Sequence, residues 1–166
     1  AMFLAMLKDF ETFDADNAAF YAPAAVDFAK YCQILLAQER GDLLPGDRSP
    51  CTTRWLQCDG RLVGTIRVRH NIDHPYLAAE SGHIGYDVAA SFRRRGFGTV
   101  MLAQALDIAA GLGVEHALLI ADADNTASIR LIERCGGVLE KMLISPEYGT
   151  PIVRYWVPTT TTTRVQ

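Results

Sequence analysis

The sequence predicts a single α/β (α+β) domain with a mixed, mostly antiparallel central sheet of about six or seven strands, flanked by about four helices. Its length of 166 residues is typical of one domain. Strand patterns come in hairpin-like pairs near both ends, and a strand–helix–strand crossover lies between them. We expect the domain to span residues 1–157 and the threonine-rich stretch 158–166 to form a solvated tail.

The first half of the chain begins with an apolar stretch, residues 2–7, that predicts a short first strand. Asp14 or Asp16 can cap a helix, and Pro23 suits the first turn of another, which apolar spacing extends to about residue 38. Asp59-Gly60 is a strong hairpin signal. The elements expected around and after this turn are strands at 54–58, 61–69 and 83–88, with a polar loop at 71–80.

The second half alternates helices and strands. Gly111 and Gly113 end an apolar helical pattern, and Asn125 can cap a second helix that stops at Gly136-Gly137. A continuous apolar run between these helices is typical of a buried strand. The predicted elements are a helix at 99–110, a strand at 117–121, a helix up to about residue 134, and final strands at 138–144 and 152–157.

Composition excludes several classes of protein. Hydrophobic residues make up 49% and charged residues 21% of the chain, which is unlike a disordered protein. The net charge of -3 argues against a nucleic-acid binder. No stretch approaches the ~18 apolar residues of a membrane span, and the first residues lack the basic segment of a signal peptide. The four cysteines form no C-x-x-C pair, so we expect a cytoplasmic protein with reduced thiols and no metal site.

The loop between the strand at 83–88 and the following helix carries the clearest functional signal. Backbone N–H groups at a helix start are unpaired and lie at the positive end of the helix dipole. Glycines allow close approach of a ligand, and three arginines add positive charge. The residues of this predicted anion site are Arg93, Arg94, Arg95, Gly96, Phe97, Gly98 and Thr99. The run matches neither a P-loop nor G-x-G-x-x-G, since Met101 occupies the third glycine position.

This R-x-x-G-x-G pattern between a strand and a helix resembles the cofactor motif of the GNAT superfamily of N-acetyltransferases. The segment His83–Val88 resembles the strand that precedes the motif in that family. Asp124–Ser128 resembles its second cofactor segment, and Gly136-Gly137-Val138 the turn that follows. The resemblance covers roughly residues 54 to 157 and is strongest to a bacterial branch of predicted acetyltransferases whose acceptor is unknown.

The resemblance implies a GNAT-like fold and direct transfer of an acetyl group from acetyl-CoA to an amine in a ternary complex. The loop amides would hold the pyrophosphate, and the pantetheine arm would pair with the backbone near Tyr86 and Val88, with Asn125 and Ser128 beside it. A backbone N–H at the splay of two strands would serve as the oxyanion donor. On this resemblance the acceptor would be a small-molecule amine or a peptide amine, and a homodimer is possible, as in other members of the family.

The sequence departs from the family at two positions that move protons. Gly82 occupies the position where the family usually has a glutamate as general base. The candidate replacements are Glu80 and His83, and the unperturbed pKa of His83 is the closer of the two to neutral pH. Ile132 occupies the position where the family usually has a tyrosine that protonates the leaving thiolate, so Cys135 and Tyr148 are left as weak candidate acids.

Other interpretations follow from these departures. The chain could be a non-catalytic acyl-CoA-binding or sensor module, or an interaction protein whose arginine loop docks an acidic partner. The loop near His83 borders the expected acceptor pocket, where Asp73 and Glu80 could attract a cationic amine. Histidines in this loop could suggest a metal, but Pro75 opposes the helix that such a site would need.

Overall fold

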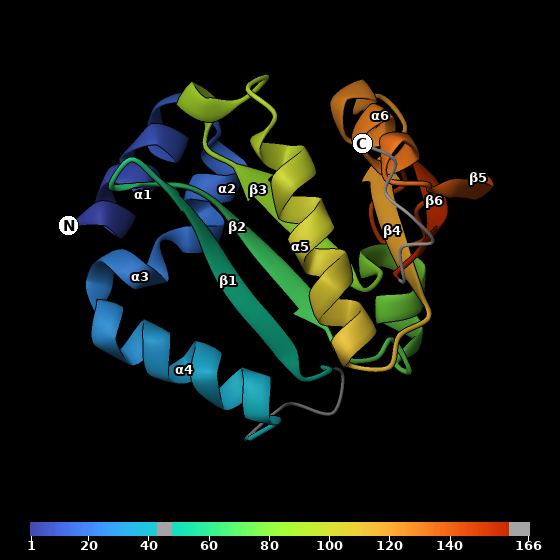
Figure 1. Cartoon of the computed structure of the whole chain (residues 1–166), viewed down its shortest axis with the longest axis horizontal. Coiled ribbons are helices and arrows are strands. Elements are labelled where there is room, and N and C mark those ends of the chain that lie inside the picture. The colour runs from blue at the N-terminus through green and yellow to red at the C-terminus, as the bar shows by residue number, and fades with distance from the viewer. Residues whose placement is uncertain (43–47, 160–166) are drawn as a thin grey trace.

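A computed structural model describes residues 1–42 and 48–159, and within them the chain forms two antiparallel sheets with helices packed around them (Figure 1). The strand orders are β1-β2-β3 and β4-β6-β5. The helices are α1 (Met2–Phe13), α2 (Ala15–Tyr21), α3 (Pro23–Val26), α4 (Phe28–Arg40), α5 (Phe97–Gly111) and α6 (Thr126–Arg134). The strands are β1 (Cys51–Cys58), β2 (Arg61–Arg69), β3 (Ile84–Val88), β4 (His116–Asp122), β5 (Val138–Ile144) and β6 (Pro151–Pro158).

These elements confirm the mixed α+β class, with six strands in two sheets across the described residues. None of the helices in residues 1–42 and 48–159 is long and apolar enough to cross a membrane. The two short helical turns η1 (Leu77–Ser81) and η2 (Ala90–Phe92) flank β3. The first of these replaces part of the polar loop expected at 71–80.

The hairpin of β1 and β2 forms at the predicted turn. Asp59 and Gly60 both have positive φ, at 49° and 72°, which matches the twist that a two-residue hairpin needs. Along β2, Ile66 and Val68 belong to the core under α5. Gly64 also lies against α5, since a Cβ there would sit 2.7 Å from the Met101 sulfur. Thr65 and Arg67 face the opposite side of the sheet because side chains alternate along a strand.

Residues 2–7 are helical, so the prediction of a first strand was wrong. The apolar positions Phe3, Met6, Leu7 and Phe10 recur at helical spacing, and all four side chains are buried. The helical period becomes visible only when the stretch is followed to Phe10, beyond the initial apolar run. Helix α1 packs beside β2 and contributes to a second core with Tyr21.

Two other boundaries differ from the prediction. Asp27 caps α4 by accepting a hydrogen bond from the Lys30 N–H, and this cap divides the single helix expected up to residue 38 into α3 and α4. The C-terminal tail expected from residue 158 begins later, because Pro158 belongs to β6 and Thr159 is buried, with its hydroxyl bonded to the carbonyls of Val114 and Glu115. The rest of the predicted tail lies outside the described residues.

Candidate functional site

The two sheets meet at one point and then separate. The His83 N–H donates to the Leu118 carbonyl of β4 at 2.7 Å, and the Leu118 N–H donates back to His83 Nδ1 at 2.9 Å. Beyond this contact β3 and β4 belong to different sheets. The backbone of β3 is therefore left with an open edge on the side away from β2.

The register identifies which backbone groups lie on that edge. The Arg69 N–H bonds to the His83 carbonyl, and the Ala89 N–H bonds to the Val63 carbonyl, so odd-numbered residues of β3 pair with β2. Ile84, Tyr86 and Val88 consequently direct their N–H and C=O groups to the open edge. The Tyr86 hydroxyl is buried, and burial raises its pKa.

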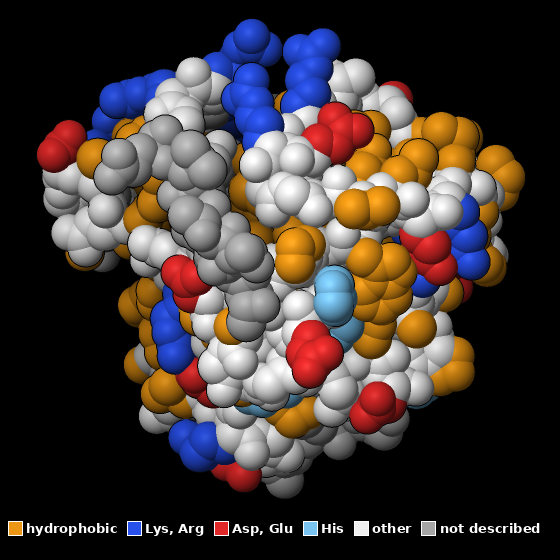
Figure 2. All heavy atoms as spheres, turned by 45° about the vertical axis from the view of Figure 1, so that its right-hand side comes forward, with side chains coloured by type: hydrophobic (Ala, Val, Ile, Leu, Met, Phe, Trp, Pro, Cys, Tyr) orange, Lys and Arg blue, Asp and Glu red, His pale blue; other side chains and the backbone are white. Residues whose placement is uncertain are grey.

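At the end of β3, residues 93–99 form the start of α5. Arg94 and Gly96 have positive φ, at 59° and 85°, and Gly96 is the N-cap without a side-chain cap. Within residues 1–42 and 48–159, we find no backbone acceptor for the N–H groups of residues 94–98. Figure 2 shows Lys and Arg side chains along the upper edge of the molecule, where Figure 1 places the start of α5 and helix α6. Free N–H groups at a helix start surrounded by positive charge favour an anion.

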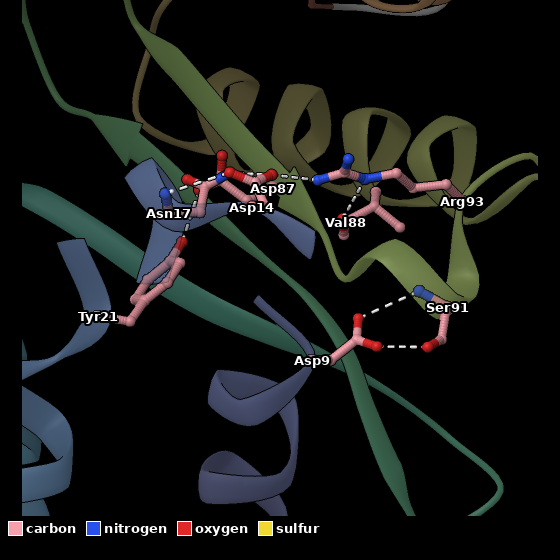
Figure 3. Close-up of polar contacts among 8 residues, drawn as sticks. All are labelled: Asp9, Asp14, Asn17, Tyr21, Asp87, Val88, Ser91 and Arg93. Carbon is pink, nitrogen blue, oxygen red and sulfur yellow. Dashed lines mark hydrogen bonds and ion pairs between the residues drawn. The ribbon is translucent and has the colours of Figure 1, made fainter. Parts of the chain in front are cut away.

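The three arginines of this loop have different surroundings. Arg93 turns back onto the protein, where Nε donates to the Val88 carbonyl at 2.9 Å and the guanidinium pairs with Asp14 (Figure 3). Burial works to raise the pKa of Asp14, but the hydrogen bond from Arg93 and the helix cap it makes to Asn17 lower the pKa overall. Arg95 lies over the rings of Phe92 and Phe97.

Arg94 is exposed, and among the described residues it makes no ion pair and lies over no aromatic ring. Arg93 instead ties the loop to the cap of α2, a contact between residues 79 positions apart. Sequence reasoning could not separate these roles because the three residues are adjacent and identical.

The second predicted cofactor segment forms the start of α6. The Asn125 side chain accepts a hydrogen bond from the Ser128 N–H at 3.1 Å and so caps the helix. Asn125 is exposed and Ser128 half-buried. Further along α6, Ile132 is 1% exposed in the core between the sheets and offers no proton to a reaction.

Gly82 occupies a backbone position that excludes a side chain. Its φ is +62°, and a Cβ there would lie 2.4 Å from the Leu118 carbonyl oxygen. A glutamate base cannot stand at this position without moving β4. The glycine is instead what lets the chain turn from η1 into the contact between His83 and Leu118.

His83 is 7% exposed, and its Nδ1 is occupied by the Leu118 N–H. In the neutral ring the proton is then on Nε2, so neither nitrogen is free to accept another. Burial, followed by the charge of Arg69, lowers the pKa of His83 and favours this neutral form. The geometry therefore gives His83 a role in holding β3 against β4.

Glu80 lies in η1 rather than on a strand. Its carboxylate accepts hydrogen bonds from the Ser145 hydroxyl at 2.8 Å and the Glu147 N–H at 3.2 Å, which fasten η1 to the turn between β5 and β6. Tyr148 follows on that turn, is 67% exposed, and its hydroxyl lies 3.2 Å from that of Tyr76. This hydrogen bond is the main cause that raises the pKa of Tyr148.

The opposite face of the first sheet carries a polar cluster that the sequence analysis missed. Tyr21 donates a hydrogen bond to Asp87 at 2.6 Å, and Arg67 donates to both, at 2.6 Å to Tyr21 and 2.7 Å to Asp87. Figure 3 shows Tyr21 reaching up to Asp87 from α2. Burial raises the pKa of Tyr21, whereas for Arg67 the charges of Tyr21 and Asp87 outweigh burial and raise the pKa. The only sequence signal was the alternation that put Arg67 on this face.

Tyr21 and Arg67 of this cluster line a cleft of about 530 Å³ on this face, between the sheet, α2, α4 and η1. Arg67 lies beside β3, because a Cβ at Gly85 would be 3.2 Å from Arg67 Nη2. The cleft therefore adjoins the strand with the open edge. Among the described residues, no group of three or more His, Cys, Asp or Glu side chains could hold a metal ion.

Comparison with known proteins identifies the family. Residues 11–137 match the model of the acetyltransferase (GNAT) family. The chain belongs to the GNAT family of acetyltransferases. No protein in a curated collection matches the sequence.

Solved GNAT structures share the fold at low sequence identity. A ribosomal-protein-alanine N-acetyltransferase from Brucella melitensis superposes with a TM-score of 0.60 at 19% identity, covering 80% of this chain and 78% of that one. The ribosomal L7/L12 α-N-protein acetyltransferase RimL, in complex with coenzyme A, gives 0.57 at 21% identity, covering 75% and 66%. A GNAT acetyltransferase from Streptococcus pneumoniae gives 0.52 at 14% identity, covering 65% and 66%. The chain thus spans about two thirds of the last two proteins.

The cosubstrate of GNAT enzymes is acetyl-CoA, and the residues present fit it. Free N–H groups of residues 94–98 suit its pyrophosphate, and the exposed Arg94 adds charge. On the open edge of β3, the Tyr86 N–H and C=O and the Val88 N–H suit the amide groups of its pantetheine arm, while the Val88 carbonyl is held by Arg93. Gly98 keeps the loop close to α6, because a Cβ there would lie 3.1 Å from Leu131.

Proposed function

We propose that this protein is an N-acetyltransferase that transfers an acetyl group from acetyl-CoA to an amine by direct attack in a ternary complex. Acetyl-CoA supplies an activated acetyl thioester when it is bound. The observation that carries the proposal is the open edge of β3, which leads from the contact of His83 with Leu118 to a helix start with free N–H groups. Family membership supports the same reaction class.

In this proposal the loop residues Arg93, Arg94, Arg95, Gly96, Phe97, Gly98 and Thr99 bind the pyrophosphate. Arg93 acts by holding the loop to Val88 and Asp14, and the N–H groups of residues 94–98 act as donors. Tyr86 and Val88 pair with the pantetheine arm through their backbone. An N–H of this edge is also the donor to the thioester oxygen as negative charge develops there. Asn125 and Ser128 shape the neighbouring start of α6.

The acceptor amine enters from the cleft on the other face of the sheet, where Arg67 lies next to Gly85 of β3. The amine must be neutral to attack. The carboxylate of Glu80 is engaged by Ser145 and Glu147, and the neutral His83 ring has no free basic nitrogen, so we assign the removal of the proton to water. Water also protonates the leaving thiolate, because Ile132 is apolar and Tyr148 is bonded to Tyr76.

The experiment that tests the cofactor is thermal unfolding with and without acetyl-CoA, with NADH and ATP as controls. A ligand at 100 times its dissociation constant stabilises the folded state by about 2.7 kcal/mol. For a chain of this size the midpoint then rises by roughly 5–11 °C. The absence of a shift at millimolar acetyl-CoA would overturn the proposal.

Two variants test the loop. Arg94→Glu reverses the charge of an exposed arginine, and Gly96→Trp fills the open space beside a backbone of positive φ. Both should abolish the shift with acetyl-CoA, whereas a site that docks an acidic protein would respond mainly to the charge. Arg40→Glu makes the same charge change on an exposed residue of α4 and should leave the shift unchanged.

The second candidate function is a non-catalytic acyl-CoA-binding module, which the residues at Gly82 and Ile132 favour because neither can transfer a proton. Release of free thiol from acetyl-CoA in the presence of an amine distinguishes the two functions. Turnover with any amine excludes the binding module. Binding without turnover, across small amines and peptides, supports it.

A further inference from the structure

The cleft from which we propose the acceptor enters, called the acceptor cleft below, is positively charged because arginines line it. Arg48, Arg67 and Arg69 line it, and none of the described lining residues is acidic. This differs from the expectation of a pocket that attracts a cationic amine through Asp73 and Glu80. Glu80 is directed to the turn between β5 and β6, and Asp73 does not line the cleft.

The arginines differ in how far their charge is already neutralised. Arg67 is paired with Asp87 at 2.7 Å and with the Tyr21 hydroxyl at 2.6 Å. Arg69 meets no carboxylate within residues 1–42 and 48–159, and Nη1 donates only to the backbone carbonyls of Gly82 and Ser81, at 3.1 and 3.4 Å. A guanidinium has five N–H donors, so Arg69 retains donors for a ligand.

The surroundings of Arg69 favour an added negative charge. Burial lowers its pKa, and the neighbouring charges of Arg67 and Arg48 lower it further. A bound anion would relieve this repulsion, while a second cation would increase it. Tyr31 of α4 and Tyr76, the residue just before η1, supply neutral walls to the same cleft.

We propose that the acceptor of this acetyltransferase is a small amine that also carries an oxyanion, a carboxylate or a phosphate, which Arg69 binds with Arg48 while the amine lies toward β3. The inference rests on the proposed function and names the substrate class of that site. A cleft of about 530 Å³ lies within the usual range for small-molecule sites and suits a molecule the size of an amino acid. Planar guanidinium groups bind carboxylate and phosphate through paired N–H donors.

The test measures thiol release from acetyl-CoA with matched acceptors. α-Amino acids are compared with their own amides, which keep the amine and lose the negative charge. Phosphoethanolamine provides the phosphate source, and spermidine provides a purely cationic amine. We expect kcat/KM for the better anionic acceptors to exceed that of the matched amides by at least about tenfold. The comparison is conservative, since the amide form of an amino acid has the less basic amine.

Variants connect this preference to Arg69. Arg69→Gln should bring the ratio of acid to amide close to one, and Arg69→Lys should retain much of it because the charge is kept. Arg54→Gln is the matched control, an arginine of β1 that pairs with Glu39 and does not line the cleft. Unfolding midpoints measured in parallel identify any variant that has lost its fold; if Arg69→Gln does not fold, Arg48→Gln removes the other arginine of the proposed pair and should lower the ratio.

Each result decides the proposal. A preference for anionic acceptors that Arg69→Gln removes and Arg54→Gln keeps supports it, and the better of amino acid and phosphoethanolamine identifies the oxyanion. Equal or faster acetylation of amides or spermidine overturns it, as does a preference that survives Arg69→Gln. A protein that shows the thermal shift with acetyl-CoA but acetylates no anionic amine overturns the acceptor class alone. A protein without that shift overturns the proposed function as well.

Discussion

The contact of His83 with Leu118 gives the sharpest prediction about how this site is built. In His83→Leu the Leu118 N–H, on a residue that is fully buried, loses its acceptor. An unsatisfied buried donor costs about 1–3 kcal/mol of the free energy of unfolding. For a chain of this length, that lowers the thermal midpoint by roughly 2–12 °C. In His83→Asn the side-chain oxygen can take the place of Nδ1, so most of the loss should be recovered.

The same contact makes stability depend on pH. Protonation of His83 at Nδ1 would bring two donors together, and burial lowers the pKa of the folded ring. As pH falls below about 6.5, the unfolded chain binds a proton that the folded chain resists. The stabilisation is therefore complete above that pH and is lost as pH falls toward the folded pKa. Denaturant unfolding at several pH values should show this decline in the wild type and a weaker one in His83→Asn.

Activity separates this structural role from that of a general base. Removal of a general base costs about 10²–10⁴-fold in rate. We expect His83→Asn to keep kcat within about tenfold of the wild type, because water takes the proton from the acceptor. A loss of 10²-fold or more in a His83→Asn protein of normal stability would refute this reasoning and restore His83 as the base.

Two further changes test the backbone around the site. Gly82→Glu restores the family's usual base, but it should lower the free energy of unfolding by more than about 2 kcal/mol without increasing turnover, because its Cβ would lie 2.4 Å from the Leu118 carbonyl oxygen at a left-handed φ. The control is Gly60→Ala, which has no atom within 4 Å of the added Cβ and so measures the cost of the positive φ alone. A Gly82→Glu protein that is stable and turns over faster would contradict the geometry. Asp14→Ala removes both the cap of α2 and the partner of Arg93. Denaturant unfolding should therefore show a free energy of unfolding lower by about 1 kcal/mol, and titration with acetyl-CoA should show weaker binding. Asp27→Ala loses only the cap of α4 and should bind acetyl-CoA as the wild type does. Equal affinity in the two variants would mean that the ion pair of Arg93 with Asp14 does not contribute to acetyl-CoA binding.

Features that depend on a few neighbouring residues were readable from the sequence. The turn at Asp59-Gly60, the cap at Asn125 and the glycine-rich start of α5 all formed where they were predicted. Each is decided by local backbone preference or by one side chain reaching a nearby N–H, so the information lies within a few positions. The helix at residues 2–13 was missed because a short apolar run fits either period.

Features that depend on contacts between distant residues were decided by the tertiary structure. Nothing near Gly82 in the sequence shows that a strand more than thirty residues later leaves no room for a side chain at this position. Nor does the sequence show that His83 Nδ1 accepts the Leu118 N–H. The arginine cleft likewise depends on Tyr21 meeting Asp87, 66 positions away. The sequence by itself determined the family, the glycine-rich loop before α5 and the order of strands and helices from β1 onward, because these follow from local patterns. Which proton carriers are free, and the charge that meets the acceptor, are determined by packing, since burial and long-range hydrogen bonds settle what each polar group can still do.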